Sequence, residues 1–287
     1  GSKYADTFKG NNSVSNTFNG GITDLSNPNS ENSSDENDKV SYADSTNPIV
    51  ANLSAGTVVI GGSVTDNLYN IEHVQGTDGD DEFTGNADDN SLIGGAGNDT
   101  FNIVDVNNGN DVIEGDTSAG NDGLRDTIDY SAISDSYYLD ADLSTNSLEL
   151  KNSSNNALAD SDIVRNIEDI TGTAGEDKIR GNASKNILRG ADDTDTIYGE
   201  AGDDVIYGDD NTDNSLNATD YEYLDGGAGA DTIYGGAGND SIIGGADDGK
   251  DTLYGGAGKD IIQAGSGVDK VYGGDDNDLI RGDAGED

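Results

Sequence analysis

The most regular feature of the chain is one apolar residue that recurs about every nine positions among glycines and acids. From Gly226 onward the sequence reads as GGAGADTIY, GGAGNDSII, GGADDGKDTLY, GGAGKDIIQ, AGSGVDKVY, GGDDNDLIR and the partial unit GDAGED. Related runs occupy residues 76–102 and 172–207. The last three residues of each unit alternate in polarity, which predicts a short strand with its central side chain in a core.

That central position defines an expected ladder of core residues. Its members are Phe83, Leu92, Phe101, Ile179, Leu188, Ile197, Ile206, Ile233, Ile242, Leu253, Ile262, Val271 and Ile280.

The first six positions of the unit, Gly-Gly-x-Gly-x-Asp, predict a tight turn that carries oxygen ligands. Glycine permits positive φ and close backbone approach, so carbonyl groups can point inward. Aspartate adds a hard oxygen ligand, which suits calcium rather than zinc or copper. Two units make one solenoid turn of about 18 residues, so turns two units apart stack and can share a cation.

Composition supports a cation partner. The chain has 58 acidic and 14 basic residues, a formal net charge of −44 and only 32% hydrophobic residues. Such a chain repels nucleic acid and anionic membranes and attracts divalent cations or basic proteins. It has no cysteine, so disulfides and thiolate sites are excluded, and no apolar run approaches a membrane span.

These units resemble the RTX (repeats-in-toxin) family, whose nonapeptide is GGxGxDxUx, where U is apolar. The resemblance covers more than half of the chain in roughly a dozen copies. It implies an all-β fold, a right-handed parallel β-roll with calcium between stacked turns. It also implies export by a type I secretion apparatus and a secreted or cell-surface location in a Gram-negative bacterium.

The position-six aspartates are the candidate calcium ligands, and about ten ions are expected. The stacking rule pairs Asp231 with Asp251, Asp251 with Asp269, Asp269 with Asp287, Asp240 with Asp260, Asp260 with Asp278, and Asp177 with Asp195. The candidate metal ligands are Asp81, Asp99, Asp177, Asp195, Asp204, Asp231, Asp240, Asp251, Asp260, Asp269, Asp278 and Asp287.

Some units depart from this pattern. Asn90 and Asn186 replace the aspartate, so weak or absent calcium binding is expected there. An insertion around 211–221 interrupts the register and leaves the roles of Asp204, Asp213 and Glu222 open.

Two longer segments, 41–75 and 131–171, separate the repeat runs. Residues 66–94 align without gaps on 162–190, and both segments begin with two short alternating strands around a turn. We therefore expect two copies of a strand-rich insert. The expected organisation is a repeat end with an acidic loop (1–40), an insert (41–75), a repeat block (76–130), the second insert (131–171) and the main repeat block (172–287).

Calcium is expected to decide folding, because each nine-residue unit buries only one large apolar side chain while its stacked carboxylates repel each other. The chain should be disordered in the cytosol and folded outside the cell. Because the last unit stops at Asp287, we expect a piece of a longer protein.

Three functional classes are open: a structural calcium module of an adhesin or toxin, the calcium tail of a secreted enzyme, and a recognition module for a glycan or protein. The chain itself is not expected to be an enzyme. His73, the only histidine, is expected to be an exposed residue at a strand end. Tyr234, Tyr254 and Tyr272 should form an aromatic row, with Tyr207 as a further candidate member; a packed ladder is favoured over a ligand-binding stripe.

Overall fold

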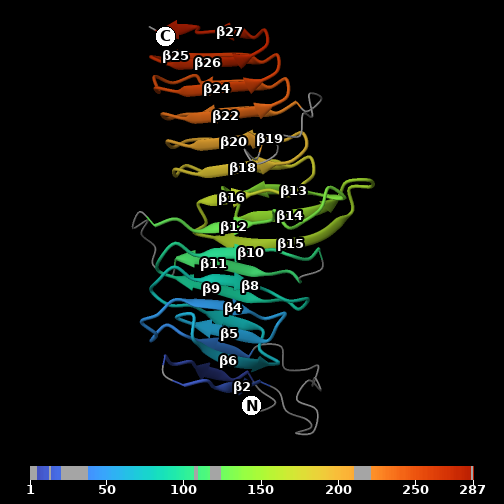
Figure 1. Ribbon diagram of the computed structural model, residues 1–287, viewed down its shortest axis with the longest axis vertical. Helices are drawn as coiled ribbons and strands as arrows, with labels where there is room; N and C mark the ends of the chain where they lie inside the picture. Colours follow the sequence, from blue (N-terminus) through green and yellow to red (C-terminus); the bar gives the residue numbers. More distant parts are fainter. Residues whose placement is uncertain are drawn as a thin grey trace. The chain divides into compact units, whose positions relative to one another are not determined.

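The protein consists of short β-strands joined by turns. The computed structural model describes residues 5–12, 14–20, 38–106, 109–116, 124–209, 221–285 and 287, and this part of the chain contains strands and no helix (Figure 1). No membrane-spanning helix is therefore found among these residues. The chain divides into two compact units, one of residues 1–129 with 160–167 and one of residues 130–159 with 168–287.

The first unit has two mainly parallel sheets. One sheet has the order β1 (Thr7–Lys9), β3 (Lys39–Ser41), β7 (His73–Gln75), β9 (Ser91–Gly95), β11 (Val112–Asp116) and β15 (Leu158–Arg165). The other has the order β2 (Thr17–Asn19), β6 (Val64–Tyr69), β5 (Thr57–Ile60), β4 (Ile49–Asn52), β8 (Glu82–Thr84), β10 (Thr100–Asn102) and β12 (Thr127–Asp129).

The second unit repeats this arrangement. One sheet has the order β14 (Ser147–Asn152), β13 (Tyr137–Asp142), β17 (Lys178–Arg180), β19 (Thr196–Tyr198), β21 (Tyr223–Gly227), β23 (Ser241–Gly245), β25 (Ile261–Gly267) and β27 (Leu279–Arg281), with β28 (Ala284–Gly285) also beside β25. The other has the order β16 (Asp169–Thr171), β18 (Ile187–Ala191), β20 (Val205–Asp209), β22 (Thr232–Ala237), β24 (Thr252–Ala257) and β26 (Lys270–Asp275). From β7 to β12 and from β16 to β27, consecutive strands therefore alternate between two sheets, which is the architecture of a parallel β-roll.

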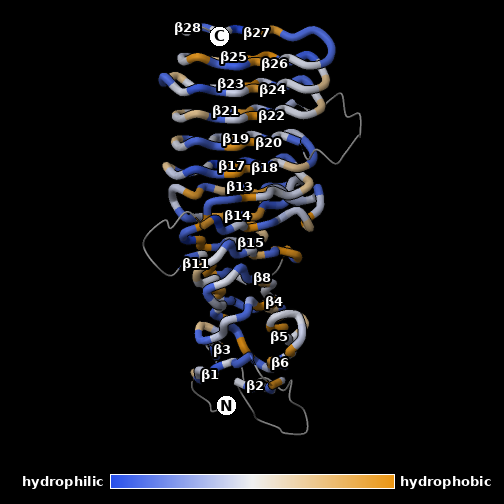
Figure 2. The backbone as a smooth tube through the Cα atoms, turned by 60° about the vertical axis from the view of Figure 1, so that its left-hand side comes forward, coloured by the Kyte–Doolittle hydropathy of each residue, from blue (hydrophilic) through white to orange (hydrophobic). Residues whose placement is uncertain are grey.

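The apolar ladder predicted from the sequence forms the core between the sheets. Ile233 pairs with Leu253, and Leu253 with Val271, in direct register. Figure 2 shows apolar colour on the strands and polar colour on the turns. Eleven of the thirteen predicted residues are buried, but Val271 is half-buried and Ile280 is 46% exposed. The prediction is wrong for these two because they lie in the last strands of their sheets, where no further strand covers them.

The two inserts form antiparallel hairpins, as the alternating pattern predicted. Strands β4 and β5 pair antiparallel, and so do β13 and β14. Each hairpin then joins a repeat block through a parallel pair, β4 with β8 and β13 with β17. The inserts are thus thickened parts of the sheets, and residues 160–167 of the second belong to the first unit.

Glycine is required where adjacent turns touch. Gly258 has φ +131°, and a Cβ placed on it would lie only 1.5 Å from the carbonyl oxygen of Gly238 in the turn below. A residue with a side chain would therefore be strained in its backbone and would collide with the neighbouring turn.

Candidate metal sites

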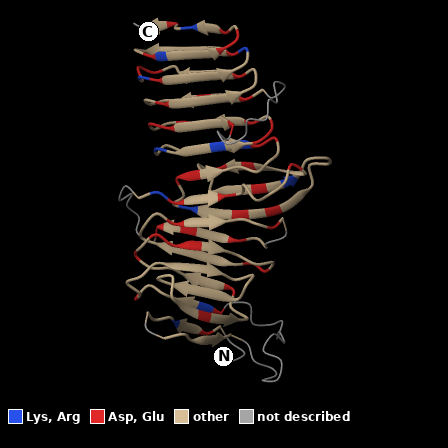
Figure 3. Ribbon diagram, viewed as in Figure 1, with Lys and Arg blue, Asp and Glu red and all other residues tan. Residues whose placement is uncertain are grey.

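The position-six acids lie directly before the strands and form columns along the stacked turns. In the second unit, a first column precedes the strands of one sheet, and its members are Asp177, Asp195, Glu222, Asp240, Asp260 and Asp278. A second column precedes the strands of the other sheet, and its members are Asp204, Asp231, Asp251 and Asp269, with the amide Asn186 in the same position at one end and Asp287, which precedes no described strand, at the other. Figure 3 shows acidic residues concentrated at the turns of this unit.

Each column is held by hydrogen bonds from one turn to the next. The backbone N–H of Asp231 donates to Oδ1 of Asp251 at 2.9 Å, and that of Asp251 donates to Oδ1 of Asp269 at 3.0 Å. The other pairs expected from the stacking rule are joined in the same way: Asp177–Asp195, Asp240–Asp260, Asp260–Asp278 and Asp269–Asp287, at 2.8 to 3.3 Å. All six expected pairs therefore lie together in the fold.

The second carboxylate oxygen lacks such a bond in several turns. Within the described part of the chain, Oδ2 is buried and accepts no hydrogen bond in Asp99, Asp195, Asp231, Asp251, Asp260 and Asp269. A buried anionic oxygen of this kind is costly unless a cation compensates it.

A backbone carbonyl faces the same space as this oxygen. A Cβ placed on Gly226 would lie 2.5 Å from Oδ2 of Asp231 and 2.6 Å from the carbonyl oxygen of Gly244, two units later. At Gly255 the corresponding distances to Asp260 Oδ2 and the Gly273 carbonyl oxygen are 2.2 and 2.3 Å. Only glycine leaves this space open, and both of the oxygens facing it are of the hard type that calcium prefers.

The electrostatics of the columns also favour a bound cation. Burial and the neighbouring carboxylates raise the pKa of Asp99 to about 8 and that of Asp231 to about 7. The same two causes raise the pKa of Asp251 and of Asp260 to about 6. Burial and the Asp177 carboxylate raise the pKa of Asp195 well above its usual range. Negative charge on these buried, closely spaced carboxylates thus has a free-energy cost that a divalent cation relieves.

The donor set fits calcium only if backbone carbonyls take part. Among the described residues, no group of three or more histidine, cysteine, aspartate or glutamate side chains converges in a metal-binding arrangement. Stacked aspartates with glycine carbonyls give an oxygen-only, partly backbone site, which suits the high coordination number and flexible geometry of calcium.

Most of the predicted ligand residues are buried in these columns. Asp81, Asp99, Asp177, Asp195, Asp204, Asp231, Asp240, Asp251, Asp260 and Asp269 are at most 4% exposed. Asp278 is half-buried and Asp287 is exposed. Whether each residue binds an ion stays a prediction.

The structure adds acids that the nine-residue period did not place: Asp111, Asp126 and Asp162 were not among the candidate ligands, and the role of Glu222 was left open. The N–H of Asp99 donates to Asp126, that of Asp111 donates to Asp162, and that of Glu222 donates to Asp240. Asp111, Asp126 and Glu222 directly precede a strand, a local signal that was available in the sequence, whereas Asp162 lies within β15. Insertions within the turns break the nine-residue period, so the repeat pattern did not reveal these acids. Asp213 lies outside the described residues, as do 21–37 of the predicted acidic loop.

Asn186 uses its side-chain amide within the protein. Its Oδ1 accepts the N–H of Asn182, and its Nδ2 donates to the carbonyl of Glu168 at 2.7 Å. In Asn90, Oδ1 accepts the N–H of Asn86 and Nδ2 donates to Asn86 Oδ1 at 3.1 Å. Both turns are thus closed by neutral groups.

The tyrosine row stacks face to face. Ring centroids of Tyr207, Tyr234, Tyr254 and Tyr272 follow each other at 4.9, 4.8 and 4.8 Å with interplanar angles of 3° to 6°. The guanidinium of Arg189 covers the ring of Tyr207 at 4.9 Å. The ring faces are therefore engaged with each other, as a packed aromatic ladder requires.

His73 is half-buried, so the expectation of an exposed residue is wrong. Its Nδ1 accepts the N–H of Ser91 at 2.9 Å, and burial lowers its pKa. Asp169, its counterpart in the second copy, accepts the N–H of Ile187 in the same way. Both side chains hold the first N–H of the neighbouring strand.

Comparison with protein families agrees with this geometry. The chain matches the family of RTX calcium-binding nonapeptide repeats (four copies) at residues 70–101, 166–197, 184–214, 222–250, 246–280 and 254–287, together just over half of its length. A search of curated proteins gave no match. With its glycine turns, stacked aspartates and parallel strands, the chain belongs to the RTX calcium-binding nonapeptide repeat family.

Proposed function

We propose that the chain is a structural module of a secreted or cell-surface RTX protein, an adhesin or a toxin, that is disordered without calcium and folds outside the cell. The observation that carries this proposal is the set of buried carboxylate oxygens in the aspartate columns that accept no hydrogen bond, represented by Oδ2 of Asp231 and Asp251. A fold that buries negative charge without a partner is poorly stable until a cation binds.

The magnitude of the calcium effect suits an extracellular switch. Extracellular calcium modules bind with dissociation constants of roughly 10⁻⁴–10⁻³ M. A site of about 10⁻⁴ M gains about 1.4 kcal/mol in about 1 mM calcium, and almost nothing at cytosolic concentrations. Several such sites in one column shift the folding equilibrium only after export.

The remaining parts of the proposal rest on the family. Export by a type I secretion apparatus of a Gram-negative bacterium would require an extended chain inside the cell, which the calcium dependence would supply. We also propose that the chain has no catalytic activity of its own, since its position-six acids serve the columns and His73 accepts a backbone hydrogen bond. Stacked tyrosine rings favour a structural ladder over a glycan-binding stripe.

The test is a calcium titration of the EGTA-stripped chain, followed by far-UV circular dichroism, with magnesium as the control ion. We expect a cooperative gain of β structure between roughly 0.1 and 1 mM calcium. Magnesium should give no such transition, because it demands tight octahedral geometry and dehydrates reluctantly. A stripped chain with full β structure would refute the folding switch.

A further inference from the structure

Four turns at the start of the repeat blocks differ from the Gly-Gly turns at 226–231, 235–240 and 255–260. They begin with Gly-Thr or Gly-Asn and span 76–81, 85–90, 172–177 and 181–186. In these turns the side chain at position two has hydrogen-bonding atoms of its own.

The first consequence is a bond inside the turn. The position-two oxygen accepts the N–H of position four in every case: Gly79 to Thr77 at 3.0 Å, Asp88 to Asn86 at 2.9 Å, Gly175 to Thr173 at 3.1 Å and Ser184 to Asn182 at 2.8 Å. Such Asx and Ser/Thr turns hold the backbone in a fixed conformation.

The second consequence concerns the backbone of position two. Gly227, Gly236 and Gly256 have φ between +96° and +117°, whereas Thr77 and Thr173 are not among the described residues with positive φ. Threonine is β-branched and disfavours that region. Its N–H instead points into the turn and donates to Oδ2 of the position-six aspartate at 2.5 Å, from Thr77 to Asp81 and from Thr173 to Asp177.

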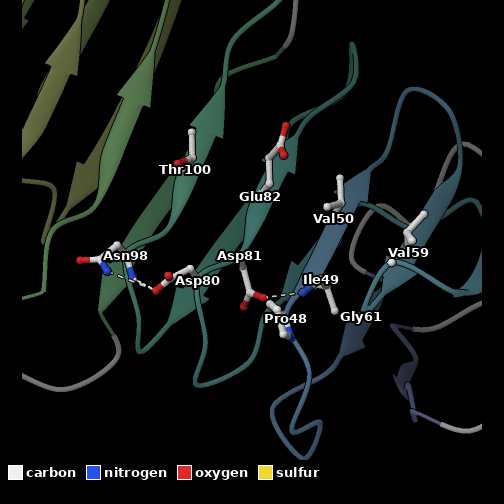
Figure 4. A pocket seen from close by; sticks show the side chains of 11 residues that line it. Pro48, Ile49, Val50, Val59, Gly61, Asp80, Asp81, Glu82, Asn98 and Thr100 are labelled. Atoms are coloured by element: carbon white, nitrogen blue, oxygen red, sulfur yellow. Dashed lines mark hydrogen bonds between the residues drawn. The ribbon is translucent and has the colours of Figure 1, made fainter.

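The aspartates of the two threonine turns are therefore satisfied on both oxygens. Oδ1 of Asp177 accepts the Thr173 hydroxyl at 2.8 Å and the N–H of Leu139 at 2.6 Å. Oδ1 of Asp81 accepts the Thr77 hydroxyl at 3.1 Å and the N–H of Ile49 at 2.6 Å. Figure 4 shows the bond between Asp81 and Ile49, beside an open pocket.

Two independent copies thus have the same set of bonds, and both tie a repeat block to its hairpin insert. The Asp231 carboxylate is equally buried, at 1%, yet its Oδ2 accepts no hydrogen bond. The difference is therefore not one of burial.

We propose that the residue at position two selects between a calcium-binding turn and a self-closed turn, and that the turns with Thr77, Asn86, Thr173 and Asn182 need no calcium. Asp81 and Asp177 are then structural residues and not calcium ligands. The self-closed turns, together with the apolar hairpins beside them, remain ordered when calcium is removed, so the calcium-dependent disorder proposed above applies to the other turns of the repeat blocks.

The hairpins have the apolar side chains that this requires. Within 131–171 the buried apolar residues are Ile133, Leu139, Ala141, Leu143, Leu148, Leu150, Val164, Ile167 and Ile170. Among the described residues of the longer repeat block 222–287, the buried apolar side chains are Leu224, Ile233, Ile242, Leu253, Ile262 and Ala264.

The first experiment counts calcium ions per chain by native mass spectrometry for Asp177→Asn and for the matched variant Asp251→Asn. Both residues are 1% exposed and both substitutions remove one charge. Asp177→Asn should retain the wild-type number of ions, whereas Asp251→Asn should lose at least one. Loss of an ion from Asp177→Asn as well would overturn the inference.

The second experiment measures hydrogen exchange of the wild-type chain in EGTA. Because it does not use the Asp177→Asn variant, it tests the inference even if that variant fails to fold. Amides of β13, β14 and β17 should exchange at least about tenfold more slowly than in the unfolded chain, while those of β22, β24 and β26 exchange freely. Thr173→Val should abolish this residual protection, and Thr232→Val, which removes a hydroxyl from an outward position, should leave it intact.

The inference rests on the proposed function, in which the other turns bind calcium. The hydrogen-exchange result distinguishes a failure of the inference from a failure of the proposed function. Free exchange throughout the stripped chain would overturn the self-closed turns and leave the folding switch standing. Protection throughout would overturn the folding switch, and the ion count would then decide on Asp177 alone.

Discussion

Asp251 is the most informative single residue of the columns, because it belongs to two stacked pairs. Its Oδ1 accepts the N–H of Asp231, and its own N–H donates to Asp269. Replacing it with alanine should therefore impair two calcium sites at once. It also removes one hydrogen bond, which contributes about 1 kcal/mol whatever the calcium concentration.

The loss of stability should grow with calcium. With a dissociation constant of about 10⁻⁴ M for each of two sites, the calcium contribution lost is about 0.8 kcal/mol at 0.1 mM, 2.8 at 1 mM and 5.4 at 10 mM. The free energy of opening is measured by amide hydrogen exchange in β22, β24 and β26, which surround the substituted turn.

Asp248→Ala is the matched control, since Asp248 is exposed in the same turn and its loss changes the net charge equally. It should change the opening free energy by less than about 0.5 kcal/mol at every calcium concentration. A loss in Asp251→Ala that is the same at 0.1 and 10 mM calcium would show that this carboxylate does not bind the ion.

Three further predictions concern protons, backbone and core. The raised pKa values of Asp99, Asp231 and Asp251, about 8, 7 and 6 against about 4 in an unfolded chain, mean that the fold binds more protons when calcium is removed. This stabilisation is complete below about pH 4 and is lost as the pH rises through 6 to 8. Acidification in EGTA should therefore increase the β signal in circular dichroism; an unchanged signal would contradict it. Gly258→Ala should destabilise by about 2 kcal/mol or more in thermal unfolding with calcium, and Gly62→Ala by only about 1, because Gly62 has φ +71°, near the left-handed region that other residues can adopt, and nothing within 4 Å of its Cβ position, whereas Gly258 has φ +131° and touches the neighbouring turn. Ile242→Ala should cost about 2–5 kcal/mol in denaturant unfolding, against about 1 for Ile280→Ala, and equal losses would argue against the observed difference in burial, 0% against 46% exposed.

The strands and core of the repeats could be predicted because their signals are local. Each unit contains its own turn, its own aspartate and one apolar residue, so Ile233 and Leu253 were placed correctly without knowledge of the rest of the fold. Ile280 was not, because burial depends on what lies against a residue. The repeat pattern says nothing about the neighbour of the last turn.

The candidate sites were harder to predict, for two physical reasons. Asp126 and Glu222 take the same place as other column acids, but insertions separate them from the glycines that begin their turns, so a fixed period misses them. The roles of Thr77 and Thr173 depend on the direction of a backbone N–H, and the repeat consensus contains no information on that direction.

The hydrogen bond that joins successive column residues has a consequence for the evolution of the chain. The same bond, at 2.8 to 2.9 Å, connects partners 18 residues apart in Asp81–Asp99, 20 in Asp231–Asp251, 27 in Asp204–Asp231 and 51 in Asp111–Asp162. The spacing between successive turns is therefore independent of the number of residues that lie between the two column positions. Segments as long as a whole hairpin can be gained or lost within one turn while every neighbouring turn keeps its partners, so these turns are points at which new peptide can be displayed without rebuilding the scaffold.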